Sequence, residues 1–229
     1  AAALAEYNKY DVAATVRMAC QTLAGQWETR CGFAEMLGPK KFAWHKTFTK
    51  LAAELFVDKP ELKMEKDDTS WMQTITQFPK CLRIEKHTGL LNYFSKPLFE
   101  LELREFSTQV NGVPHVFKIG GAHSVNGRAV YKGDIWDIDV SGMYPSLMCL
   151  FNLCSRTMDA KKYNEVRMAR MAMAKSDWRR NVYKQALNST YGGTLESFST
   201  LFDPAKGRQV CVLGQLFIVD LLEKLEPYV

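Results

Sequence analysis

Residues 184–193 read KQALNSTYGG, and this stretch places three chemically different side chains on one side of a helix. Lys184, Asn188 and Tyr191 are four and then three residues apart, which is the spacing of neighbours along one helical face. The intervening Gln, Ala and Leu favour helix, and we expect Gly192-Gly193 to end it as a left-handed cap. A cation, an amide and an aromatic ring on one face can meet a phosphate, a sugar edge and a base. On these residues alone, an ordinary surface helix is the commoner interpretation.

The flanking sequence predicts that this helix is the second half of a helical hairpin. Residues 161–175 and 177–191 both have helical patterns, and Ser176 or Asp177 can cap the second helix. A loop containing FDPAKG follows, and a last helix is expected over about 208–226. The hairpin is basic, which fits either a phosphate-binding arm or a solvated face; its cations are Arg167, Arg170, Lys175, Arg179, Arg180 and Lys184.

Residues 136–146, WDIDVSGMYPS, are the second informative stretch. Asp137 and Asp139 would point to the same side of a strand, because the side-chain period of a strand is two. Asp139 would end that strand, and Pro145 suits the first turn of a following helix. A carboxylate beside an irregular turn can share a divalent cation with backbone oxygens. The alternative is an aspartate that only caps a turn.

The remaining sequence predicts an α+β chain with an antiparallel sheet. Helices are expected over 2–24 and around 48–57, with an exposed loop over 58–70. Between 72 and 140, four segments alternate apolar and polar residues and predict strands, with turns at Asn111-Gly112, Asn126-Gly127 and Gly133; they are TQFPKCLRIEK, FELELREF, VPHVFKIGG and RAVYKGDIWDIDV. Taken alone, IGGAHSVNG (119–127) predicts a turn between strands.

Composition narrows the class of protein. The net charge of +5 permits a polyanionic partner without requiring one. The six cysteines form no CxxC pair and no zinc-finger spacing, which favours a reduced cytoplasmic chain with free thiols. The most apolar run, VCVLGQLFIV (210–219), is about half the length of a membrane span, so no membrane partner is expected.

Two of these stretches resemble motifs of family B DNA polymerases. DVSGMYPS (139–146) resembles the first polymerase motif, D-x-x-S-L-Y-P-S, and KQALNSTYG (184–192) matches the fingers motif, K-x-x-x-N-S-x-Y-G. IGGAHS is similar to the glycine-glycine segment that precedes the first motif. YNKYD (7–11) is similar to the motif that closes the 3′–5′ exonuclease domain. The GGAHS and VCVLGQL segments are most like polymerases of phages and mobile elements.

The resemblance implies a domain division and a fold. It assigns 1–24 to the end of an exonuclease domain, 25–116 to a connector and the start of the palm, and 117–160 to the palm with its first motif. It assigns 161–193 to a two-helix fingers hairpin and 194–229 to a palm helix. The implied fold is α+β, with a partial antiparallel palm sheet.

The resemblance also implies a function: transfer of deoxynucleotides to a primer 3′-hydroxyl with two magnesium ions, in the cytoplasm of a bacterial host. The implied partners are primer–template DNA and deoxynucleoside triphosphates. By position, the resemblance implies that Asp139 and the Val140 carbonyl bind metal, that Tyr144 discriminates between sugars, and that the triphosphate is bound by Lys184, Asn188, Arg170 and Lys175. It implies that the nascent base pair contacts Tyr191 and Gly192, and that the template contacts Gly120, Gly121 and His123. Tyr7 and Asp11 would be a remnant of the exonuclease domain.

The sequence departs from the family pattern in places. Gly142 and Met143 stand where the first motif has Ser and Leu, and Lys118 stands where a tyrosine precedes the glycine pair. The last polymerase motif, which supplies a second carboxylate, is expected after the final helix, and the sequence reaches Val229 without it. We therefore expect this chain alone to bind DNA or nucleotide without polymerising. The missing acids are either in a part of the protein that has been cut off or on a second polypeptide. The alternative is a noncatalytic nucleic-acid-binding remnant, whose DNA binding would be indifferent to magnesium.

Overall fold

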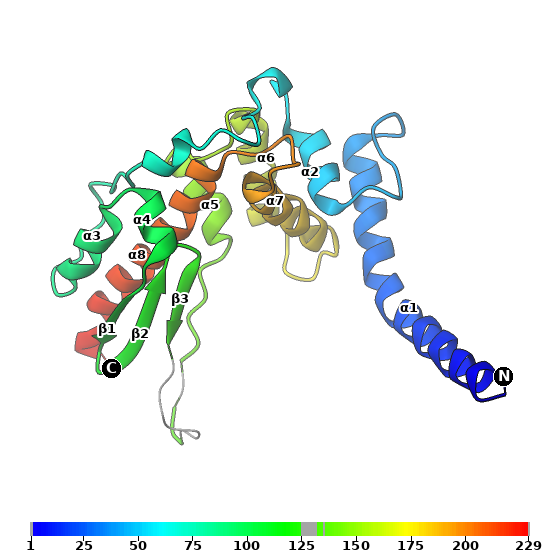
Figure 1. The fold of residues 1–229 in the computed structure, drawn as a ribbon, viewed down its shortest axis with the longest axis horizontal. Helices are drawn as coiled ribbons and strands as arrows, with labels where there is room; N and C mark the ends of the chain where they lie inside the picture. Colours follow the sequence, from blue (N-terminus) through cyan, green and yellow to red (C-terminus); the bar gives the residue numbers. More distant parts are fainter. Residues whose placement is uncertain (1, 125–131, 135, 229) are drawn as a thin grey trace.

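The computed structural model describes residues 2–124, 132–134 and 136–228, which form helices and one small antiparallel sheet (Figure 1). The α-helices are α1 (Ala2–Leu37), α2 (Phe48–Phe56), α3 (Thr88–Phe94), α4 (Leu98–Leu103), α5 (Met143–Leu150), α6 (Ala160–Ala172), α7 (Arg179–Leu195) and α8 (Pro204–Leu225). Short 3-10 turns are η1 (Pro60–Leu62), η2 (Ser70–Gln73) and η3 (Glu226–Tyr228). The strands are β1 (Phe106–Val110), β2 (Val113–Lys118) and β3 (Gly121–Ser124). The expected α+β class with an antiparallel sheet is confirmed.

Helix α7 is the centre of one group of helices, packed by α1, α2 and α6. Tyr163 of α6 is fully buried, and its hydroxyl donates to the Leu187 carbonyl of α7 at 3.1 Å. Gly32 lets α1 approach α7 closely, since a Cβ there would lie 2.5 Å from the Val182 side chain. The side chains of residues 6–18 of α1 are exposed, and the N-terminal half of this helix runs away from the other helices (Figure 1).

The sheet and α8 form the other part of the fold. Val110 pairs with Val113 across a two-residue turn, and both Asn111 (φ 50°) and Gly112 (φ 75°) are left-handed, as this tight hairpin turn requires. A second turn at residues 119 and 120 leads from β2 to β3. Helix α8 packs against this sheet, where the Gln215 side-chain amide donates to the Lys118 carbonyl at 2.9 Å. Both turns predicted here from the sequence, Asn111-Gly112 and the glycine pair, are confirmed.

Two predicted strands are wrong. Most of FELELREF (99–106) lies in helix α4 instead, which begins at Leu98 and buries Leu98 and Leu101, three residues apart. The strand begins only at Phe106. Residues 76–86 form no strand in the described structure. Their backbone N–H groups donate to carboxylates of α8 rather than to a neighbouring strand: Arg83 to Asp220 at 3.2 Å and Glu85 to Glu223 at 2.8 Å.

The strand predicted over 128–140 is also absent from the described residues of that segment, 132–134 and 136–140. Residues 136–140 are exposed and belong to no strand, because no other described strand pairs with them. Asp137 and Asp139 therefore do not share a strand face. The Asn126-Gly127 turn and most of the first half of this predicted strand lie outside the described residues.

The helical hairpin predicted over 161–191 is confirmed as α6 and α7, although its helices begin and end at other residues than expected. The predicted cap by Ser176 or Asp177 is not formed: the N-cap of α7 is Trp178, without a side-chain capping hydrogen bond. The Asp177 carboxylate, just before it, accepts from the Arg179 backbone N–H at 2.9 Å. The predicted glycine cap is wrong: α7 continues through Gly192 and Gly193 to Leu195. The last helix begins at Pro204, earlier than expected. None of the helices in the described parts of the chain is both long and apolar enough to cross a membrane.

Candidate nucleotide site between α5, α6 and α7

A pocket of about 430 Å³ lies where the start of α5 faces α6 and α7. Its walls come from three segments that are distant in sequence: residues 139–145, one arginine of α6 and one face of α7. The lining residues are Asp139, Val140, Ser141, Gly142, Met143, Tyr144, Pro145, Arg170, Lys184, Asn188 and Tyr191. The two sequence stretches that predicted functional residues independently therefore meet at one cavity.

Helix α7 divides its side chains between the core and this pocket. Val182, Ala186 and Leu187 are buried, whereas Lys184 and Asn188 are exposed on the opposite side. No hydrogen bond or ion pair joins the Lys184 or Asn188 side chain to any other described residue. A cation and an amide thus stand next to each other in the pocket with their polar groups available to a ligand.

Arg170 is the most unusual side chain of the pocket. Only 8% of its surface is exposed, yet its Nε has no hydrogen-bond partner and no described carboxylate forms an ion pair with it. Burial, and the charge of Arg180 nearby, lower the pKa of this guanidinium. The Gly142 backbone, with φ 65°, comes close beneath it: a Cβ there would lie 3.0 Å from Arg170 Nη1. A buried cation without a counter-charge is costly, and an anionic ligand would remove that cost.

Other arginines of the hairpin are already bonded within the protein. Arg167 donates to the Asn164 side-chain carbonyl at 3.0 Å and to the Ser146 hydroxyl at 3.3 Å. Arg180 donates to the Met173 carbonyl at 2.7 Å, and Arg179 is paired with Asp177. Of the four arginines of the hairpin, Arg170 is the one that lines the pocket and has no partner among the described residues.

Two tyrosines close the side of the pocket nearest the sheet. The rings of Tyr144 and Tyr191 meet edge to face with centroids 4.6 Å apart. Both hydroxyls lie against the thiol of Cys211 on α8, Tyr191 at 2.7 Å and Tyr144 at 3.7 Å. Burial is the main cause that raises the pKa of both phenols, and the neighbouring Cys211 is the second. Both phenols therefore stay protonated. The same thiol lies 3.7 Å from the Gly120 carbonyl, so it joins the tyrosines to the β2–β3 turn.

Asp139 is the one carboxylate among the described residues that line the pocket. Within the described part of the chain, no three His, Cys, Asp or Glu residues gather as a metal-binding group. One carboxylate beside unpaired cations is a poor site for a bare ion. It suits a magnesium ion that arrives with an anionic ligand, since Mg²⁺ is usually held by one or two carboxylates together with substrate phosphates.

Several predicted residues lie elsewhere. Lys175 is exposed in the loop between α6 and α7 and does not line the pocket. His123 is exposed on β3, and Gly121 lines a separate pocket that also includes Tyr144. Tyr7 and Asp11 are exposed on the projecting half of α1. Gly192 follows Tyr191, and a Cβ there would meet no atom within 4 Å.

Cys211 is a site residue that the sequence reasoning missed. The six cysteines show no pattern that distinguishes it. The sequence does hold one indication of close packing here, at Gly214, one helical turn after Cys211. Glycine is unfavourable in the interior of a helix and usually marks a close contact with another element. A Cβ at Gly214 would lie 3.0 Å from Tyr144 Cε1, so this glycine is what lets the tyrosine pack against α8.

Comparison with protein-family models, with curated proteins and with solved structures finds no match for this chain. The interpretation of the pocket therefore rests on its residues and their geometry.

Proposed function

We propose that this pocket binds the magnesium complex of a deoxynucleoside triphosphate, and that the chain is a segment of a DNA-directed DNA polymerase of the family B type. In this proposal the parent enzyme transfers deoxynucleotides to a primer 3′-hydroxyl under the direction of a template. The α6–α7 hairpin would be its fingers, and the sheet with α8 would belong to its palm.

The observation that carries the proposal is the buried, unpaired guanidinium of Arg170 beside the unpaired ammonium of Lys184. Two cations line this pocket against one carboxylate, Asp139, and neither forms an ion pair with a described carboxylate, which favours a polyanionic ligand. Arginine is well suited to bind phosphate oxygens in a forked geometry. The pocket also carries an amide at Asn188 and an aromatic edge at Tyr191. A nucleoside triphosphate has groups to match each of these: phosphates, a sugar and a base.

Asp139 and the Val140 carbonyl are the groups that would hold the magnesium ion in this pocket. When bound, the metal would stabilise the charge that develops on the phosphates during nucleotidyl transfer. The chain's own residues would orient the substrate. Lys184 and Arg170 would bind the phosphates, and Asn188 would fix their position. Tyr144, held by Cys211, would lie under the sugar, where it would disfavour a 2′-hydroxyl.

Equilibrium binding of Mg-dATP to the purified chain tests the proposal. We expect Lys184→Gln to weaken binding at least about tenfold, since a charge-assisted contact to phosphate contributes roughly 1.5–3 kcal/mol. Lys161→Gln is the matched control, because Lys161 is exposed on α6 and does not line the pocket.

Equal binding by the two variants would place the nucleotide elsewhere and contradict the proposal. Binding of DNA without any magnesium-dependent nucleotide binding would instead support the noncatalytic alternative, whose affinity falls steeply with salt.

A further inference from the structure

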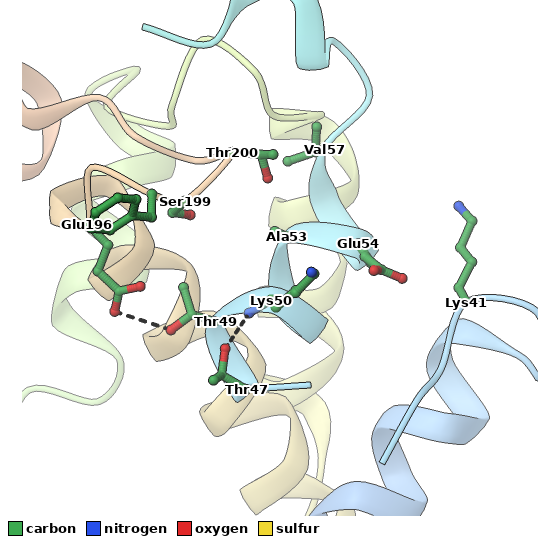
Figure 2. A pocket seen from close by; sticks show the side chains of 11 residues that line it. Lys41, Thr47, Thr49, Lys50, Ala53, Glu54, Val57, Glu196, Ser199 and Thr200 are labelled. Carbon is green, nitrogen blue, oxygen red and sulfur yellow. Dashed lines mark hydrogen bonds between the residues drawn. The ribbon is translucent and has the colours of Figure 1, made fainter. Parts of the chain in front are cut away.

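A pocket of about 590 Å³ lies where α2 meets the segment that follows α7 (Figure 2). Its walls carry two lysines, Lys41 and Lys50, and two glutamates, Glu54 and Glu196, so their formal charges balance. Figure 2 shows Glu196 accepting a hydrogen bond from the Thr49 hydroxyl. This pocket indicates no particular ligand, whereas a pair of cysteines at the end of α5 carries specific chemistry.

Cys149 and Cys154 lie together at the end of α5, whereas the start of this helix lines the nucleotide pocket. The thiol of Cys154 donates a hydrogen bond to the sulfur of Cys149. The Cys154 sulfur also lies 3.6 Å from the carbonyl oxygen of Met148, the residue before Cys149. Both thiols are free, so the two sulfur atoms are neighbours that no disulfide joins.

The backbone at the end of α5 turns back and brings the two cysteines together. The Leu153 N–H donates to the Met148 carbonyl at 2.9 Å, and Asn152 between them is left-handed, with φ 55°. This combination is the Schellman motif, which ends many helices. Asparagine is one of the residues other than glycine that adopt the left-handed conformation most readily. The position of Cys154 beside the last turn of α5 is therefore built into the helix end.

The two thiols have different surroundings. Cys149 is partly exposed, whereas Cys154 is buried, with 3% of its surface exposed. The hydrogen bond from Cys154, and then the charge of Arg167, lower the pKa of the Cys149 thiol to about 7. The same hydrogen bond, followed by burial, raises the pKa of Cys154. The chain thus holds an accessible thiolate, the reactive form of cysteine, against a protonated thiol.

Arg167 of α6 is fixed in its place beside Cys149. Its guanidinium donates to the Asn164 side chain at 3.0 Å and to the Ser146 hydroxyl at 3.3 Å. Ser146 and Cys149 are three residues apart on α5, so they share the helical face that Arg167 meets. The contacts of Arg167 with both helices hold its positive charge next to the Cys149 sulfur.

We propose that Cys149 and Cys154 are a modification site, at which a hydroperoxide converts the two thiols into a disulfide. In the first step the Cys149 thiolate attacks one oxygen of the peroxide. The S–O bond forms, the O–O bond breaks, and the second oxygen leaves as hydroxide and takes a proton from solvent. The sulfur loses two electrons and becomes a sulfenic acid, and the peroxide is reduced.

In the second step the Cys154 sulfur attacks the oxidised Cys149 sulfur. The S–S bond forms, the S–O bond breaks, and the leaving hydroxide takes the Cys154 proton and departs as water. Because the Cys154 thiol already donates to Cys149, this proton has a direct path to the leaving group. The site does not depend on the proposed function, since neither cysteine lines the nucleotide pocket.

The test treats the full chain with about one equivalent of hydrogen peroxide, blocks the remaining thiols under denaturing conditions and identifies disulfides by mass spectrometry. Cleavage after Phe151 separates the two cysteines in sequence, so their peptides stay together only through the disulfide. We expect joined peptides from the wild-type chain and their loss on reduction with dithiothreitol. Cys81→Ser is the matched control and should leave the joined peptides unchanged, because Cys81 is exposed and precedes α3.

Two variants separate the steps. In Cys154→Ala, which keeps the buried position apolar, oxidation should stop at the Cys149 sulfenic acid, and dimedone should label that residue. In Cys149→Ser, dimedone should leave Cys154 unlabelled, because its thiol is buried and protonated. Label on Cys154 in this second variant would contradict the assigned roles.

A wild-type chain that keeps both thiols while Cys81 is oxidised overturns the inference. Sulfenic acid that accumulates on Cys149 of the wild-type chain without a disulfide overturns it as well, since Cys154 would then not react. A disulfide that forms as fast in the urea-unfolded chain would show that short sequence separation, rather than the folded helix end, makes the site, and it would also overturn the inference. These results are independent of whether the chain binds Mg-dATP.

Discussion

Replacing Arg170 by methionine should stabilise the fold and, at the same time, weaken nucleotide binding. Arg170 is 8% exposed and its Nε is unpaired, and a buried unsatisfied polar group costs about 1–3 kcal/mol, more for a charged one. Methionine keeps most of the volume and removes the charge. We expect the free energy of unfolding to rise by about 1–2 kcal/mol, which for a chain of this size raises Tm by roughly 2–8 °C.

The same substitution three residues earlier provides the control. Arg167 lies on the same helix, but its guanidinium is bonded to Asn164 and Ser146. Arg167→Met should therefore lower the free energy of unfolding by about 1 kcal/mol, because two satisfied hydrogen bonds are lost. Thermal and urea unfolding of both variants show whether the free energy of unfolding rises or falls. Mg-dATP titration measures the loss of affinity, which we expect to be at least about tenfold for Arg170→Met.

The reasoning fails if Arg170→Met unfolds more easily than the wild-type chain. That result would mean that Arg170 serves the fold, not a ligand. It would also fail if the variant were more stable but bound Mg-dATP unchanged.

Further predictions concern packing and pH. Gly193→Ala should lower the free energy of unfolding by about 1–2 kcal/mol, because its Cβ would lie within 3.1 Å of Leu201, Thr49 and Ser199 atoms. Gly192→Ala, which adds a Cβ in open space inside a helix, should raise the free energy of unfolding by up to about 1 kcal/mol. Urea unfolding that gives both variants the same change in stability would contradict the packing described for α7. Cys149 should be alkylated by iodoacetamide with a midpoint near neutral pH, because a hydrogen bond from Cys154, and then the charge of Arg167, lower the pKa of its thiol to about 7. Arg167→Gln should move that midpoint to higher pH, as followed by mass spectrometry of the Cys149 peptide, and an unmoved midpoint would exclude the arginine's contribution.

The sequence predicted the helices best where capping and periodicity agreed. The α6–α7 hairpin and the Asn111-Gly112 turn follow from local chemistry, and both are present. The face shared by Lys184, Asn188 and Tyr191 needs only helical spacing, so it too could be predicted. Local reasoning could also place Pro145 in the first turn of α5.

Strands and long-range contacts were predicted less well, for physical reasons. A strand needs a neighbouring strand to pair with, and the backbone N–H groups of Arg83, Glu85 and His87 donate to carboxylates of α8 instead. Local pattern predicts a helix cap at Gly192-Gly193, but Gly193 lies inside α7 and packs closely against α2. The contact of Cys211 with two tyrosines joins residues 20 and 67 positions apart in sequence, and no local pattern encodes it.

The measurement that tests the central claim most directly is a calorimetric titration of the chain with dATP, with and without magnesium, for the wild type, Asp139→Asn and Asp137→Asn. Asp139 lines the pocket and Asp137, two residues away, does not, so the second variant is a matched control. We predict magnesium-dependent binding that Asp139→Asn weakens at least about tenfold and Asp137→Asn leaves unchanged. Binding that ignores magnesium, or that both variants weaken equally, would contradict the assignment of this pocket to a metal–nucleotide complex.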